Sequence, residues 1–411
     1  MLHRRLRSLL LVLVCTSALH AQGPEVTSWI INTRGETGYN GLPSNVQLVR
    51  YSADNVYVSC TCIPGYDIGP WQGNPNTPMN QDFVFRIPRQ PRHNDGSPVA
   101  TPLGHVGLWS NGVSIFNAKD ARSYNNAGIW NQNAVVVEGP SFDECLGHPA
   151  PNGEYHHHLN PPCLYDEADS SRHAPIIGYA FDGYPVYGAY GYRNSDGSGG
   201  VARMRSSYRL RAIDERNTLS NGTTLDDSQR GPTVSTRYPR GYYCEDYEYV
   251  EGLGDLDENN GRLCVTPEYP EGTYAYFVTL DEKDEAAYPY TLGPAYYGVT
   301  AQDNIGPGSG HITPTEPVET WSPSSVKSDN VPATPAIVPN PATTGVTVRT
   351  PSDGGPWRIV LVDVTGRLFV TTANVGNGEE RRIPLGEIPS GFYILRMVSE
   401  DRIERSILIV R

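Results

Sequence analysis

The apolar residues of this chain occur in short runs that alternate with polar residues and stop at Gly, Pro, Asn or Asp. Asn45–Tyr51, Phe83–Ile87 and Tyr274–Leu280 are typical runs. Alternation with a period of two indicates strands with one buried face. No long run has helical spacing, and no short-period repeat indicates a solenoid or propeller. The pattern predicts an all-β protein, with one large β-rich domain with long loops over residues 25–305.

The N-terminal segment has the features of an export signal. Three arginines within the first seven residues precede the apolar run Leu9–Val14, and Ala21 is a small residue at a suitable cleavage position. The run is too short to span a bilayer. We therefore predict a signal peptide over residues 1–21 and a mature chain that begins near Gln22.

A change of composition separates the large domain from the C-terminus. Residues 306–337 are rich in Pro, Ser and Thr, which predicts a flexible linker. From 338 to 411 the alternation returns, with turn residues between short apolar runs. This last segment is predicted to form a small Ig-like β-sandwich.

Three motifs in the last segment occur in a fixed order. They are Val338-Pro339-Asn340-Pro341, the turn from Asp363 to Arg367, and Ser390-Gly391-Phe392-Tyr393. Together they resemble the C-terminal sorting domain of the type IX secretion system. The resemblance implies the type IX secretion machinery as partner, export through the periplasm and outer membrane, and a secreted or cell-surface protein. An ordinary Ig-like domain is the less preferred interpretation.

Charge and motif content exclude several classes of function. The formal net charge is -13, which disfavours nucleic acid and anionic membranes as partners. The sequence has no Gly-x-Ser-x-Gly elbow, phosphate loop, His-Glu-x-x-His motif or dinucleotide fingerprint. The common hydrolase, kinase and dehydrogenase sites therefore lack support.

Six cysteines follow the signal segment, and an even number in an exported chain suggests disulfides. The preferred pairs are Cys145–Cys163, which would enclose a histidine-rich loop, and Cys244–Cys264. A bridge between Cys60 and Cys62 would be strained. These two thiols either pair or pack elsewhere, or bind a soft metal.

The segment with the most side chains suited to metal binding or catalysis is Tyr155-His156-His157-His158, between Cys145 and Cys163. In an extended backbone His156 and His158 point to one face, and Tyr155 and His157 to the other. Two imidazoles on one face are a common start of a metal site.

This segment and two others are similar to the YHYH-domain family of exported proteins. The other segments are Ala174–Gly188 and Gly272–Thr279, and the resemblance covers roughly Trp29 to Val299. His157 replaces the Tyr of the family motif, which leaves the shared face intact. A second aromatic-His pattern, frequent near the end of the family's domain, lacks its histidine here. The resemblance implies a fold and little about chemistry.

We therefore predict a metal site of three or four histidines. The ligands would come from His156, His158 and His148, with one of His105 or His173. Imidazole ligands suit transition metals, and copper or zinc is preferred. The alternative is a structural cluster whose neutral rings bond to the loop backbone.

Two other segments carry weaker signals. Asp182 precedes a glycine and is expected to cap a turn, although it would become an acid/base candidate if it faced the histidines. The loop 255–261 resembles a calcium loop but lacks the closing Glu, so an exposed acidic turn is preferred.

Three functions follow from these observations. The first is extracellular metal capture or metal-dependent chemistry. The second is a metal-free surface module that binds glycan or protein. The third is a secreted metalloenzyme of unknown substrate, which an open coordination position beside a cleft would favour.

Overall fold

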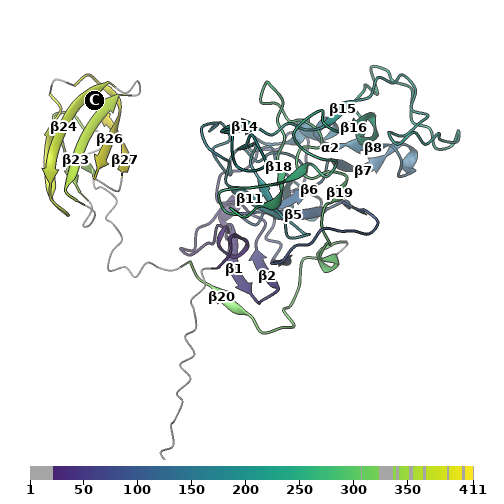
Figure 1. The fold of residues 1–411 in the computed structure, drawn as a ribbon, viewed down its shortest axis with the longest axis horizontal. Coiled ribbons are helices and arrows are strands. Elements are labelled where there is room, and N and C mark those ends of the chain that lie inside the picture. The colour runs from purple at the N-terminus through teal and green to yellow at the C-terminus, as the bar shows by residue number, and fades with distance from the viewer. Residues whose placement is uncertain are drawn as a thin grey trace, which may run out of the picture. The chain divides into compact units, whose positions relative to one another are not determined.

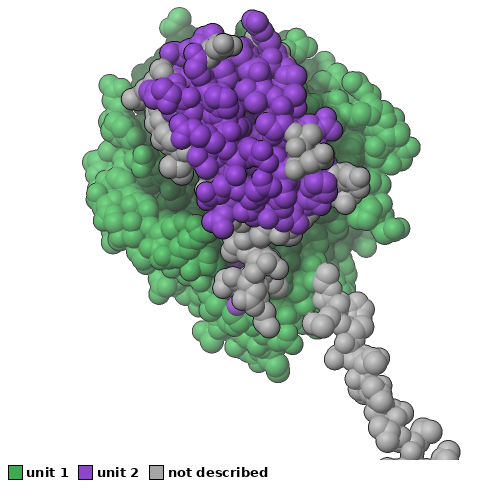
Figure 2. Space-filling view, turned by 90° about the vertical axis from the view of Figure 1, so that its left-hand side faces the viewer, with its two compact units in different colours: residues 1–321 green, residues 322–411 purple. Residues whose placement is uncertain are grey.

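A computed structural model describes residues 22–306, 308–323, 337–338, 342–350, 355–363, 367–386, 388–399 and 403–410. The chain divides into two compact units, residues 1–321 and 322–411, which are described separately (Figures 1 and 2). The predicted signal peptide at 1–21 and residues 324–336 of the predicted linker lie outside the described residues.

Two sheets build the first unit. One has the order β20-β1-β2-β3 and the other the order β17-β18-β12-β11-β5-β6-β10-β9. The first sheet consists of β20 (Glu319–Trp321), β1 (Val46–Tyr51), β2 (Asn55–Cys60) and β3 (Phe83–Pro88). The second consists of β17 (Gly261–Cys264), β18 (Thr273–Phe277), β12 (Pro185–Tyr187), β11 (Ile176–Ala180), β5 (His105–Trp109), β6 (Ser114–Phe116), β10 (Tyr155–His157) and β9 (His148–Pro149).

The hydrophobic core of this unit follows from the alternation in its strands. In β3, Phe83, Phe85 and Ile87 are buried, and the residues between them are partly exposed. Strands β11 and β12 lie inside the large sheet and are buried along their whole length. Side chains of both sheets join in one apolar cluster. The prediction of a large all-β domain is confirmed.

Long loops and short strand pairs surround the two sheets. The pairs are β4 (Val99–Ala100) with β19 (Ala295–Tyr296), β7 (Lys119–Ser123) with β8 (Asn131–Asn133), β13 (Tyr190–Tyr192) with β14 (Val201–Arg203), and β15 (Tyr208–Leu210) with β16 (Tyr247–Tyr249). The helical segments are α1 (Pro24–Thr27), α2 (Ala134–Val137), η1 (Tyr39–Gly41), η2 (Tyr124–Asn126), η3 (Gly139–Ser141), η4 (Cys244–Asp246) and η5 (Gln302–Asn304). Within the described part of the chain, no helix has the length and apolarity needed to cross a membrane.

The first part of the expected linker is part of the body. The amide of Ile312 donates to the carbonyl of Val84 over 3.1 Å. Strand β20 pairs with β1, and Trp321 lies opposite Val49. Composition alone suggested a linker from residue 306, but an edge strand needs few apolar residues when the sheet supplies its hydrogen bonds. The body therefore extends to Trp321.

The second unit is a two-layer β-sandwich. One sheet consists of β21 (Ile337–Val338), β22 (Gly345–Arg349) and β25 (Glu380–Pro384), and the other of β24 (Leu368–Val375), β23 (Trp357–Asp363), β26 (Gly391–Val398) and β27 (Ile403–Val410). Val346, Ile359 and Leu395 come from different strands and share one buried core. Of the sorting-domain motifs, residues 339–341 and 364–366 lie outside the described residues. The Ig-like connectivity stays a prediction.

One of the two preferred disulfides is formed. Cys145 and Cys163 are bonded, and they enclose the histidine-rich segment. The pair Cys244–Cys264 was wrong, because both thiols are free and buried. Cys264 at the end of β17 belongs to the main core, whereas Cys244 packs in a separate cluster with Tyr288 and Tyr290. Cys60 and Cys62 are also free, and both pack in the main core.

Candidate metal centre

A short hairpin places the first two histidines of the site opposite each other. Strands β9 and β10 are antiparallel, and His148 is the register partner of His156. The loop between them closes with a hydrogen bond of 2.8 Å from the amide of Gly153 to the carbonyl of Ala150. Gly153 has a φ of 81°, which a residue with a side chain adopts only with strain. Residues directly opposite in such a pair project from the same face.

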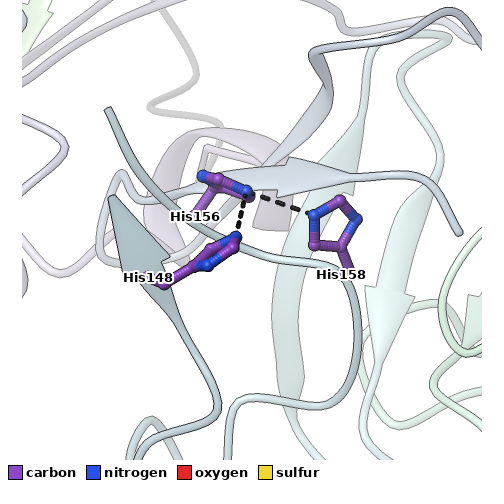
Figure 3. A group of neighbouring side chains, drawn as sticks. All are labelled: His148, His156 and His158. Carbon is purple, nitrogen blue, oxygen red and sulfur yellow. Dashed lines mark hydrogen bonds between the residues drawn. The ribbon is translucent and has the colours of Figure 1, made fainter. Parts of the chain in front are cut away.

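His158 joins the pair because it follows His156 by two residues, as the alternation predicted. His156 Nε2 lies 3.1 Å from His148 Nε2 and 3.2 Å from His158 Nε2. Figure 3 shows the rings of His148 and His158 both turned toward His156. All three residues are buried. Within the described part of the chain, this is the one group of three or more His, Cys, Asp or Glu residues close enough to share a metal ion.

Each ring is oriented by an oxygen at its far nitrogen. His156 Nδ1 lies 3.1 Å from the carbonyl of Glu154, and His158 Nδ1 lies 2.6 Å from the carbonyl of Asn117. His148 Nδ1 lies 2.8 Å from Ser141 Oγ. The Ser141 hydroxyl already donates to the carbonyl of Glu138 over 2.7 Å, so it accepts from His148. All three Nδ1 atoms therefore carry a proton.

This arrangement leaves three Nε2 lone pairs directed toward one another. Unprotonated nitrogens at such distances repel each other unless a proton or a metal ion lies between them. Burial lowers the pKa of His148 to about 4 and holds the pKa of His156 well below its usual value. A proton is therefore disfavoured on these two rings at neutral pH.

The nitrogen spacing matches the edges of a coordination polyhedron. Metal–imidazole bonds of about 2.0–2.2 Å imply distances of about 3.0–3.5 Å between neighbouring ligand atoms. The observed Nε2–Nε2 distances of 3.1 and 3.2 Å fall in that range. Hydrogen bonds from Nδ1 to a backbone or hydroxyl oxygen are also the contacts that usually orient histidine ligands and fix their tautomer.

Glu138 adds a carboxylate that sequence analysis missed. Its Oε2 lies 3.1 Å from His158 Nε2 and 3.8 Å from His148 Nε2. Burial raises the pKa of Glu138, but its contacts with His158 and His148 outweigh burial and lower the pKa below its usual value. Glu138 follows helix α2 with no metal-site spacing to the histidines, so only the tertiary structure brings it to the group.

The group lies at the wall of a cavity of about 570 Å³. His148, His156, His158 and Glu138 all line it, together with Phe116, whose ring stacks on His156 with centroids 3.9 Å apart. A ligand in the cavity can therefore approach the convergent Nε2 atoms.

His157 lies on the opposite face, as predicted. Its ring packs edge-on against Tyr155 and Trp109, with centroid distances of 5.2 and 6.3 Å. Burial lowers its pKa to about 3. His157 is therefore a neutral core residue, separate from the convergent group.

The structure places His105 and His173 in other environments. His105 Nδ1 lies 3.0 Å from Glu154 Oε1, and its Nε2 lies 2.8 Å from Ser309 Oγ. His173 Nδ1 bonds to the carbonyl of Ala174 over 2.7 Å, and the ring packs on Tyr187. Neither belongs to the convergent group. Closeness in sequence did not predict this, because each ring is held by a different strand or loop.

The two weaker candidate segments are occupied by protein contacts. Asp182 accepts the amide of Tyr184 over 3.3 Å, the turn contact that was expected. Its other oxygen accepts the Tyr276 hydroxyl over 2.6 Å. In the calcium-like loop, Asp257 Oδ1 accepts the Tyr274 hydroxyl over 2.9 Å and Asp255 pairs with Arg205. Calcium binding there stays a prediction.

Asp182 should make stability depend on pH. Its full burial raises its pKa to about 6, against about 3.9 in an unfolded chain. The native state therefore binds the extra proton, and stability falls as pH rises from about 4 to about 6, by about 2–3 kcal/mol. Asp182→Asn should lack this loss. Urea unfolding of both proteins across this pH range measures it, and parallel pH curves would contradict the assignment.

Two family models match the chain. Residues 84–287 match the model described as YHYH protein, and residues 336–411 match the secretion system C-terminal sorting domain. The chain carries a YHYH domain. The matched segment includes β9, β10 and all three convergent histidines, and the matched sorting domain lies within the second unit. A type IX sorting domain means that this YHYH-domain protein is exported to the cell surface or secreted.

The remaining comparisons add little. None of the curated proteins matches the chain. A solved structure with some similarity is PorZ, a bacterial surface component of the type-IX secretion system of Porphyromonas gingivalis. The identity is 12%, with 90% of this chain and 52% of that chain covered, and the TM-score is 0.17. The chain thus spans about half the length of PorZ, and the likeness carries no argument about fold or function.

Proposed function

We propose that this exported protein binds one transition-metal ion through His148, His156 and His158. The observation that carries the proposal is the convergence of three Nε2 atoms whose Nδ1 partners are all hydrogen-bond acceptors. Nitrogen ligands with a nearby carboxylate suit zinc or copper. Glu138 is the candidate fourth ligand, or the group that accepts a proton from a metal-bound molecule.

The cavity supports a role in metal-dependent chemistry over simple storage. Closed metal sites have all positions taken by protein, whereas catalytic sites keep one open. Here three imidazoles and Glu138 line a cavity of about 570 Å³, so a small molecule has room beside the metal. The sorting domain supports action outside the cell and the type IX secretion machinery as the partner of the second unit.

Elemental analysis tests the proposal most directly. The full chain is purified untagged, without chelators, and its metal content is measured per mole of protein. About one equivalent of zinc or copper supports the site. A metal-free protein that takes up less than a tenth of an equivalent from buffered zinc or copper contradicts it and favours a structural cluster.

The Ser141 hydroxyl offers a sharper test of the tautomer argument. Ser141→Ala removes the acceptor that holds His148 Nδ1–H, so His148 is free to change tautomer. Loss of such a contact should weaken metal binding about 10–100-fold. Competition with a chromogenic chelator measures the affinity. Ser141→Thr keeps the hydroxyl and should restore binding, and Ser171→Ala, at the surface, is the control. Equal affinity in Ser141→Ala and wild type would argue against the assignment.

A further inference from the structure

The cavity above the three histidines has a second wall with a different chemistry. Strands β7 and β8 form this wall, and Arg122, Gln132 and Lys119 line it. Within the described part of the chain, none of these three side chains forms a hydrogen bond or an ion pair. They leave donor groups available to a ligand.

Positive charge is scarce in this protein, which makes the wall distinctive. The chain has 45 acidic residues against 32 lysines and arginines, and only three of these are lysines. One of the three, Lys119, lines the cavity together with Arg122. With a divalent metal on the histidines, positive charge in the cavity exceeds the negative charge of Glu138 and Asp120. The cavity then favours an anion.

Other lining residues restrict the anion further. Leu103 is 51% exposed, and Val137 and Phe116 add apolar surface. A ligand with an apolar part would cover this surface. Asp120 lies on the same face of β7 as Arg122, because residues two apart along a strand share a face. Its carboxylate and that of Glu138 reduce the positive charge that a ligand meets in the cavity.

We propose that the cavity binds a small carboxylate with an apolar body, with its carboxylate held by Arg122, Gln132 and the charge of the bound metal. The proposal rests on the proposed metal site. It names the substrate class of that site, since a carboxylate is also a ligand for zinc and copper. Bidentate pairing with a carboxylate is the typical role of an unpaired guanidinium.

Calorimetric titration of the zinc-loaded full chain with benzoate tests the proposal. Benzamide, which has the same shape without the charge, and phenyl phosphate, which carries more charge, are the comparison ligands. We expect benzoate to bind at least tenfold more tightly than benzamide, and more tightly than phenyl phosphate. Arg122→Gln should weaken benzoate at least tenfold and leave the zinc content unchanged. Arg172→Gln changes an exposed arginine that does not line the cavity, so it should leave benzoate affinity unchanged.

The outcomes separate this proposal from the metal site. Equal benzoate affinity in Arg122→Gln and wild type, or equal affinity for benzamide and benzoate, overturns the carboxylate site even if zinc is bound. Tighter binding of phenyl phosphate assigns the cavity to phosphate esters and also overturns it. If no zinc is bound, the metal site fails. Benzoate binding that Arg122→Gln abolishes would then still support the anion site, and absence of benzoate binding would refute both.

Discussion

Replacement of both His156 and His158 by Ala should reduce bound metal from about one equivalent to less than a tenth. These residues supply two of the three convergent Nε2 atoms, and their Nε2 atoms lie 3.2 Å apart. Loss of a single outer-shell contact costs about 10–100-fold in affinity, so loss of two ligands should cost more than that. Elemental analysis after dialysis against buffered zinc measures the change.

Two buried histidines outside the group are the matched controls. His173→Gln removes a ring that bonds to the Ala174 carbonyl, and His157→Gln removes a ring on the opposite face of β10. Both should keep about one equivalent of metal, provided that circular dichroism shows a folded protein. Equal metal content in the double variant and the wild type would sink the assignment. An equal loss of metal in His157→Gln would show that metal content depends on buried histidines in general and not on the three convergent Nε2 atoms.

Arg216→Met should destabilise the body by about 3–5 kcal/mol, the usual cost of leaving one member of a buried ion pair without its partner. Arg216 and Asp246 are fully buried, and two hydrogen bonds of 2.7 Å join them. Arg216 also donates to the carbonyls of Pro232 and Pro239. It thus connects the loop residues 216–239 to η4, directly before β16. Urea unfolding and hydrogen exchange of residues 216–239 measure the effect.

An exposed pair provides the comparison for Arg216. Arg209 lies 2.9 Å from Glu248, and its side chain is 57% exposed. Arg209→Met should therefore cost less than about 1 kcal/mol. Combining Arg216→Met with Asp246→Leu should recover part of the loss, because the second change removes the unpaired buried charge. Equal destabilisation by Arg216→Met and Arg209→Met would contradict the role assigned to the buried pair.

The candidate site divides clearly into what local sequence specifies and what it does not. The shared face of His156 and His158, and the separation of His157 from them, follow from strand alternation, which depends only on neighbouring residues. The bond between Cys145 and Cys163 was also preferred from sequence. The wrong pair, Cys244–Cys264, had equally suitable spacing, but η4 and β17 hold these thiols in different cores.

Local patterns in the chain specify the all-β class, the two folded segments, the export route through the sorting domain and the shared face of His156 and His158. Each of these depends on periodicity or on short motifs. His148 was a candidate from sequence, but tertiary contacts were needed to select it over His105 and His173 and to bring Glu138 beside the group. The register of β9 and β10 depends on the turn between them, which Gly153 closes. The position of Glu138 and the separation of His105 and His173 from the group depend on packing between segments that are distant in sequence, which no local pattern encodes.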